Sequence, residues 1–295
     1  MLKFTTHPPL VAYIRCEQKA PQRPDPCRVR LCERVTWDTQ AKTFVASLTA
    51  QTLTLIFSFV ALGFGHDPPE ALETILVLET VVQLVELAWY SVVAIYVCRN
   101  PGSFDIPVHS RYIDWVITTP TMLISLYFFL VYQGELKKDK SCVSNHDLSQ
   151  SNDFSVRLVV IVLADWLMLA PGFYHEKSAR RRRKIGWEGV DNEEQWPWQV
   201  CGVPIALFAG FVFLLVAFVP HSLALYEEYS HEGLALLLGT FFVWAIYGVV
   251  AVRFDSKTEA GQQAKNSCYN ILDIFSKNVF GLVISAIALS HGGSC

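Results

Sequence analysis

The sequence predicts an all-α membrane protein, a bundle of seven transmembrane helices. Of its 295 residues, 52% are hydrophobic and only 17% are charged, which is below the roughly 25% typical of soluble chains. Seven apolar stretches are each long enough to cross a bilayer core of about 30 Å, which takes around 20 helical residues. The chain contains no repeat and most connections are short, so one bundle accounts for it.

The predicted spans are residues 43–65, 69–98, 109–133, 153–174, 198–219, 231–253 and 267–290. They form one transmembrane domain, 43–295, after an extramembrane tail, 1–42, that lacks the apolar core of a signal peptide. In the tail, Cys16, Cys27 and Cys32 form disulfides if it is extracytoplasmic and are otherwise free thiols. No CxxC pair indicates a metal site. The net charge of -3 and the scattered basic residues give no nucleic-acid binding motif.

The first two spans carry polar stripes. In the first, Ser47, Gln51, Thr54 and Ser58 recur at spacings of four, three and four, and therefore share one helical face. In the second, the stripe consists of Glu79, Gln83 and Glu86. Carboxylates in a spanning helix are costly unless they face a partner, a cavity or water. Two interpretations stay open: hydrogen bonds between helices, at about 0.6–2 kcal/mol each, or a hydrated path for cations.

The third span begins with Arg111 and Asp114, three residues apart on one helical face, and continues through Thr118, Thr119 and Pro120. A membrane proline frees a backbone carbonyl, and neighbouring threonine hydroxyls compensate locally. On these residues alone, Arg111 and Asp114 also fit a structural ion pair. The next three spans contribute Asp165, Met168, Gly172, Trp198, Trp244 and Tyr247. Taken singly, the aromatic residues among them are packing residues.

The last span contains Lys277, four residues after Asp273, so that amine and carboxylate share a helical face. An ammonium at the centre of a membrane helix costs roughly 2.5–3.5 kcal/mol on insertion scales. One explanation is a buried ion pair that fixes helix packing. The other is a Schiff-base lysine with its counterion, because an aldehyde cofactor requires a desolvated amine.

Together these residues resemble the microbial (type 1) rhodopsins over nearly all of residues 43–290. The third span matches the family's RxxDWxxTTP run from Arg111 to Pro120, and Trp244 with Tyr247 matches its WxxY. The resemblance implies all-trans retinal, bound covalently to Lys277 as a protonated Schiff base. It implies a pocket formed by Trp115, Thr119, Met168, Gly172, Trp198, Trp244 and Tyr247.

The resemblance also assigns the charged residues around the Schiff base. Asp114 and Asp273 are the candidate counterions and proton acceptors, Arg111 balances the excess negative charge, and Tyr247 bonds to Asp273. Thr119 and Asp165 form a pair across the third and fourth helices, where channelrhodopsins have cysteine in place of the threonine.

The transport class depends on Asp114, Thr118 and Ser125, the family's three signature positions on the third helix. Ser125 stands where an outward proton pump places its carboxylic donor, and a serine hydroxyl does not supply a proton near neutral pH. A channel needs only a gated hydrated path. The candidate path residues are Gln51, Glu79, Gln83 and Glu86. Gly248, where pumps commonly have proline, is a further departure.

The leading hypothesis is therefore a light-gated channel for protons and monovalent cations such as sodium, most like the pump-like cation channelrhodopsins, and not an enzyme. The alternatives are a light-driven proton pump without the usual cytoplasmic donor and a photosensor without transport. The resemblance further implies a multi-pass protein of the cell membrane, in contact with the lipid bilayer, that assembles as a homo-oligomer, a dimer or a trimer.

The membrane orientation is open, because two indications oppose each other. The resemblance places the N-terminus outside the cell. The loops on the side of the N-terminal tail hold most of the Lys and Arg, including Lys265, while the opposite loops hold only Lys137, Lys138 and Lys140. The positive-inside rule would place the tail in the cytoplasm.

Overall fold

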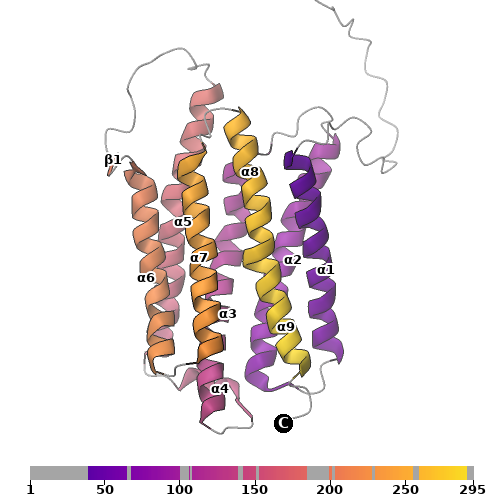
Figure 1. Cartoon of the computed structure of the whole chain (residues 1–295), viewed down its shortest axis with the longest axis vertical. Helices are drawn as coiled ribbons and strands as arrows, with labels where there is room; N and C mark the ends of the chain where they lie inside the picture. The colour runs from indigo at the N-terminus through magenta and orange to yellow at the C-terminus, as the bar shows by residue number, and fades with distance from the viewer. Residues whose placement is uncertain are drawn as a thin grey trace, which may run out of the picture. The chain divides into compact units, whose positions relative to one another are not determined.

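The computed structural model describes most of the chain between Thr39 and Ser290, drawn in Figure 1. The described residues are 39–64, 68–99, 106, 108–138, 142–150, 153–184, 199–200, 203–227, 230–254 and 259–290. The predictions for Trp198, Cys16, Cys27 and Cys32 lie outside these ranges.

Helices make up almost all of the described chain. The α-helices are α1 (Thr39–Phe64), α2 (Glu70–Arg99), α3 (Tyr112–Lys137), α4 (Asn145–Ser149), α5 (Phe154–Lys184), α6 (Ile205–Glu227), α7 (His231–Arg253), α8 (Glu259–Asp273) and α9 (Phe280–Ser290). A 3-10 turn, η1 (Val108–Arg111), precedes α3, and a π-helical segment, η3 (Ile274–Val279), joins α8 to α9. Two short strands, β1 (Gln199–Val200) and β2 (Val203–Pro204), pair antiparallel before α6.

Within the described ranges, seven helical segments are long and apolar enough to cross a membrane, with η1 and α3 as one segment and α8, η3 and α9 as another. This confirms the predicted all-α fold with seven spans, and the helices run side by side in Figure 1. The π-helical segment was not predicted. It contains Lys277, and π-turns inside α-helices occur frequently at functional sites.

The fifth span begins later than the sequence predicts. The prediction starts it at residue 198, whereas α6 starts at Ile205, after the β1–β2 pair. Pro204 explains the difference, because the residue before a proline favours extended backbone and a proline is well tolerated where a helix begins.

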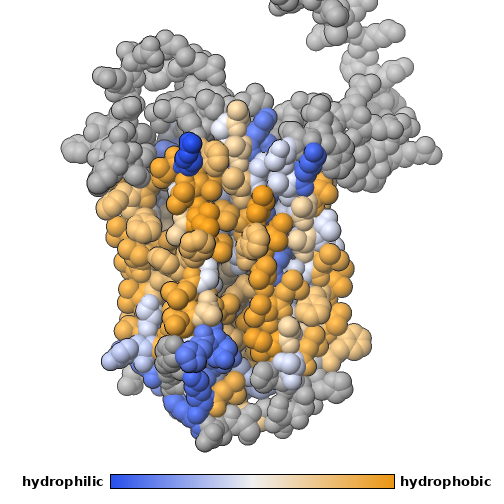
Figure 2. All heavy atoms as spheres, in the orientation of Figure 1, coloured by the Kyte–Doolittle hydropathy of each residue, from blue (hydrophilic) through white to orange (hydrophobic). Residues whose placement is uncertain are grey.

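The outer surface of the bundle is apolar. Large side chains such as Ile113, Phe242 and Val92 are 65–68% exposed, and Figure 2 shows a broad hydrophobic band on the viewed face. Conversely, many polar side chains are buried, among them Gln51, Glu79 and Asp165. Soluble proteins rarely expose apolar surface of this extent, so this pattern is that of a multi-pass protein in a lipid bilayer.

A buried ion pair links three helices. Lys265 of α8 lies with its Nζ 2.7 Å from Glu176 Oε1 of α5, and it donates to the Ala251 carbonyl of α7 at 3.1 Å. Both charged side chains are at most 2% exposed. The assignment of Lys265 to a loop is therefore wrong, because α8 begins at Glu259, and this lysine does not count toward the loop charges that bear on orientation.

We expect Lys265→Met to destabilise the bundle by about 3–5 kcal/mol, because it removes the cation that compensates a buried carboxylate. The measurement is the thermal midpoint of the detergent-purified protein. The double variant Lys265→Met with Glu176→Leu replaces both charges by apolar groups and should recover most of the loss. A single variant as stable as the parent would contradict this account.

Candidate functional site

Lys277 lies inside the bundle among three carboxylates. Its Nζ is 3.0 Å from Asp114 Oδ2, hydrogen-bonds to Glu86 Oε2, and lies 3.9 Å from Asp273 Oδ1. All four side chains are at most 2% exposed. Glu86 comes from α2, Asp114 from α3 and Asp273 from the end of α8, so the cluster joins three spans around one amine.

Arg111 forms its ion pair with Asp273. Its Nη1 lies 2.8 Å from Asp273 Oδ2, while its other nitrogens donate to Asn270 and Asn266. The guanidinium also stacks on Trp89, with Cζ 4.9 Å from the ring centroid. Arg111 therefore pairs with Asp273 of another span and not with Asp114, the pair that the sequence had left open. Asp114 contacts Lys277 instead.

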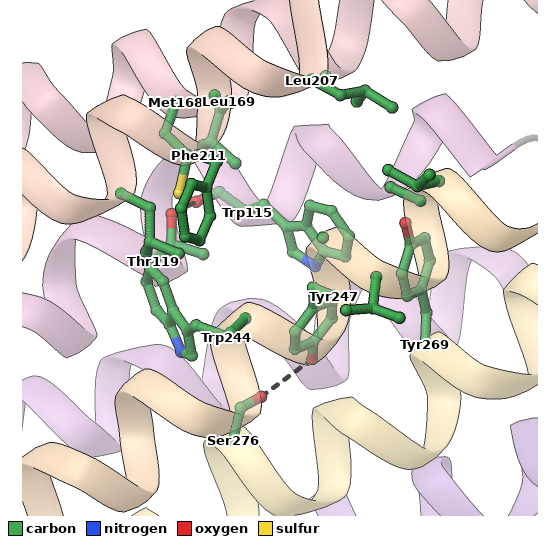
Figure 3. A pocket seen from close by; sticks show the side chains of 18 of the residues that line it. Trp115, Thr119, Met168, Leu169, Leu207, Phe211, Trp244, Tyr247, Tyr269 and Ser276 are labelled. Atoms are coloured by element: carbon green, nitrogen blue, oxygen red, sulfur yellow. Dashed lines mark hydrogen bonds between the residues drawn. The ribbon is translucent and has the colours of Figure 1, made fainter. Parts of the chain in front are cut away.

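Two tyrosines complete the shell of Asp273. Tyr90 of α2 donates to Oδ2 at 2.9 Å, and Tyr247 of α7 donates to Oδ1 at 2.7 Å, as the resemblance implied for Tyr247. The Tyr247 hydroxyl also lies 3.0 Å from Ser276 Oγ, the contact dashed in Figure 3. With Arg111, these donors hold Asp273 in one place.

Lys277 is one of the residues that line a cavity of about 560 Å³. Figure 3 shows aromatic and apolar side chains turned toward this space, among them Trp115, Trp244 and Tyr247. The residues that line it include the expected Trp115, Thr119, Met168, Gly172, Trp244 and Tyr247. The Thr119 hydroxyl donates to Asp165 Oδ2 at 2.8 Å, a hydrogen bond between α3 and α5.

Sequence reasoning missed several lining residues. From α6 they are Leu207, Phe208, Gly210, Phe211 and Leu214, and from other elements Tyr112 and Tyr269. The α6 residues give no signal, because almost every position of that helix is apolar. Tyr269 did offer one: it precedes Lys277 by eight residues, close to two helical turns, and its ring stacks on Tyr247 at 5.4 Å.

The polar stripes of α1 and α2 face inward, beside Lys277. Gln51, Glu79 and Gln83 are fully buried, and Gln83 Nε2 donates to the Lys277 carbonyl at 3.0 Å. Several buried polar atoms in this region have no hydrogen-bond partner among the residues that the structure describes: both amide atoms of Gln51, Gln83 Oε1, Glu86 Oε1 and both amide atoms of Asn278.

Residues 39–291 match the sequence family described as bacteriorhodopsin-like protein. The chain belongs to this family. Its fold is similar to three solved structures. They are blue light-absorbing proteorhodopsin from Med12 (20% identity, TM-score 0.56, covering 86% of this chain and 98% of that one), thermophilic rhodopsin from Rubrobacter xylanophilus (19%, 0.58, 87% and 100%) and xanthorhodopsin (14%, 0.60, 86% and 94%). A search of curated proteins found no match.

Members of the bacteriorhodopsin-like family bind retinal covalently through a Schiff base, and retinal is the cofactor of this chain. The cavity fits such a group. It is lined by aromatic and apolar side chains that suit a polyene, and its volume lies in the usual range of ligand pockets, about 300–1,000 Å³. Beside Lys277, which lines the cavity, Glu86 Oε1 and Asp114 Oδ1 are buried without a donor from the described residues and are available as acceptors near a cationic nitrogen.

Gly172 provides space in this cavity. A Cβ at this position would lie 2.5 Å from the Tyr112 hydroxyl oxygen, whereas a Cβ at Gly248 would meet nothing within 4 Å. A methyl group at position 172 would therefore meet Tyr112, whereas one at Gly248, which also lines the cavity, would enter space free of protein atoms.

We expect Gly172→Ala to impair retinal loading, because overpacking costs about 1–3 kcal/mol, a loss of roughly tenfold in binding. The measurement is the growth of visible absorbance when retinal is added to the apoprotein. Adding Tyr112→Phe removes the closest atom and should restore loading. Gly239→Ala is the matched control, because a Cβ there meets nothing within 4 Å and Gly239 is not among the residues that line the cavity. Equal loading by Gly172→Ala and Gly239→Ala would contradict the steric explanation.

Proposed function

We propose that the protein is a retinal-binding photoreceptor that acts as a light-gated channel for protons and monovalent cations such as sodium. The observation that carries this proposal is the row of buried polar atoms on α1, α2 and η3 near Lys277 that have no hydrogen-bond partner in the described part of the chain. Buried polar groups in proteins are normally hydrogen-bonded, and water is the partner that fits such a row. A hydrated row of this kind is what cation conduction requires.

The light-sensitive part of the proposal places the Schiff base on Lys277. Lys277 lines the cavity, and Glu86 and Asp114 contact its amine directly. Bound retinal supplies light absorption and photoisomerisation. The protein's part is to hold the polyene with Trp115, Trp244 and the other lining side chains, and to stabilise the cationic nitrogen with carboxylates.

We expect Lys277→Ala to abolish the visible absorption band after retinal is added, because no other amine lines the described cavity. The double variant Lys265→Met with Glu176→Leu serves as the matched control, since it removes a buried lysine outside the cavity without leaving its partner charge uncompensated, and it should keep the band. The spectrum of the purified protein checks both. A visible band of normal intensity in Lys277→Ala would place the attachment elsewhere.

The proposed path follows Gln51, Glu79, Gln83 and Glu86. The α2 residues share one face of the helix, and Gln51 lies on the buried stripe of α1. Thr54 of that stripe and Gln83 both approach Gly281 of α9, so three spans meet at this level. Glutamates along such a path favour cations over anions. Thr119 and Asp165, on the other side of the cavity, are the proposed gate pair.

One observation favours the alternative of a light-driven proton pump. The buried Glu79 carboxyl has the Ser125 hydroxyl as a polar neighbour, so a carboxylic acid on α2 lies beside the serine that occupies the usual donor position. Xanthorhodopsin, similar to this chain in fold, is described as a light-driven ion pump. Glu79 therefore separates the two functions.

We expect whole-cell photocurrents that reverse sign with voltage, with a reversal potential that moves by up to about 59 mV per tenfold change in the permeant monovalent cation. Glu79→Gln removes a carboxyl from the path and should shift the relative permeabilities while the current persists. Glu73→Gln, on the exposed side of the same helix, is the matched control.

Photocurrents of one fixed sign at every voltage would contradict the channel. If Glu79→Gln also abolished that stationary current and Glu73→Gln did not, the pump would be the better description. Photocycling protein without any current in either test would favour the photosensor.

A further inference from the structure

The cluster around Lys277 contains more negative than positive groups. Lys277 and Arg111 are the cations, and Glu86, Asp114 and Asp273 are the carboxylates, all at most 2% exposed. If every group were ionised, one negative charge would be uncompensated in the bundle interior. Burial of such a charge is strongly unfavourable, and a carboxyl group in this position takes up a proton instead.

The hydrogen bonds indicate which carboxyl group stays ionised. Asp273 accepts from Arg111 at 2.8 Å, from Tyr90 at 2.9 Å and from Tyr247 at 2.7 Å. A carboxylate that accepts several hydrogen bonds, one of them from a guanidinium, is stabilised in its charged form. The extra proton therefore does not belong on Asp273.

Glu86 and Asp114 differ from Asp273 in this respect. Both contact the same Lys277 nitrogen, and each keeps one buried oxygen, Glu86 Oε1 and Asp114 Oδ1, without a donor. The two carboxyl groups also lie within hydrogen-bonding reach of each other. One proton between them removes the repulsion of two adjacent carboxylates and supplies a missing donor.

We propose that Glu86 and Asp114 share one proton in the dark and act together as the counterion of the Schiff base. Glu86 is then part of the counterion, a role that its place in the α2 stripe did not suggest. Among the described residues, the other ionisable groups that face this pair are Lys277 on η3, Arg111 with Asp273, Tyr90 on α2 and Tyr247 on α7. The inference rests on retinal attachment at Lys277 and is independent of ion conduction.

The test is an alkaline titration of the retinal-loaded protein in the dark, followed by visible and infrared spectroscopy. In the parent protein, release of the shared proton should shift the visible band to shorter wavelength while the Schiff base stays protonated. The alkaline-minus-neutral infrared difference should show the loss of one carboxylic acid C=O band, sensitive to deuterium exchange. Carboxylic acids that keep their proton through the colour change do not contribute to this difference spectrum.

Glu86→Gln and Asp114→Asn should each abolish both signals, because one carboxylate beside Lys277 needs no proton. Glu73→Gln is the control and should keep both. If Glu86→Gln still showed the visible shift or the loss of the carboxylic acid band at the pH of the parent protein, the proposal would be overturned. If that variant does not bind retinal, Glu86→Asp keeps the carboxyl group and should show the transition at a changed pH, and an unchanged pH would overturn it.

The parent protein alone also provides a decisive result. If its alkaline colour transition occurs without loss of a carboxylic acid band, no shared proton exists and the proposal fails. These dark spectra do not depend on photocurrents, and Lys277→Ala tests the attachment site separately. Failure of the shared proton is thus distinguishable from failure of the channel proposal.

Discussion

The rest of the site depends on one interaction, the contact of the Lys277 amine with Glu86 and Asp114 in the interior of the bundle. A cation there is tolerable only because carboxylates from two other spans reach it. Arg111 and Asp273 form a second pair beside it, fixed by tyrosine and asparagine side chains. The π-helical segment belongs to the same arrangement, since it carries Lys277 and connects it to α8, which ends at Asp273.

The spacing of Asp273 and Lys277, the motif of the third span and the number of spans are local patterns, so each could be found in the sequence alone. What it did not predict comes from contacts between distant segments. Glu86 lies 191 residues from Lys277, so its periodicity on α2 revealed a buried face but not which group that face meets. Lys265 resembled a loop charge because its partner, Glu176, lies 89 residues away. The α6 lining residues were hidden in a uniformly apolar helix.

Glu86 also connects the two halves of the proposed function. It belongs to the polar stripe of α2, and it contacts the amine to which we assign retinal. One turn away on the same helix, Gln83 donates to the backbone carbonyl of Lys277. The side chain and the backbone of one residue are therefore both bonded to α2. A displacement of Lys277 changes contacts of the proposed path directly, without a relay through intermediate residues.

The same part of α2 also lies close to α1 and α9 along the proposed path. A Cβ at Gly281 of α9 would lie 3.0 Å from Gln83 Nε2 and 3.5 Å from Thr54 of α1, so three spans meet closely there. Farther along α1, Ser58 and Ser285 of α9 hydrogen-bond at 3.2 Å. A hydrated path past Gln83 requires its amide to release the Lys277 carbonyl and turn aside. Under the channel proposal this contact is a second constriction, in addition to the proposed gate pair Thr119 and Asp165, and it ends on the residue to which we assign retinal.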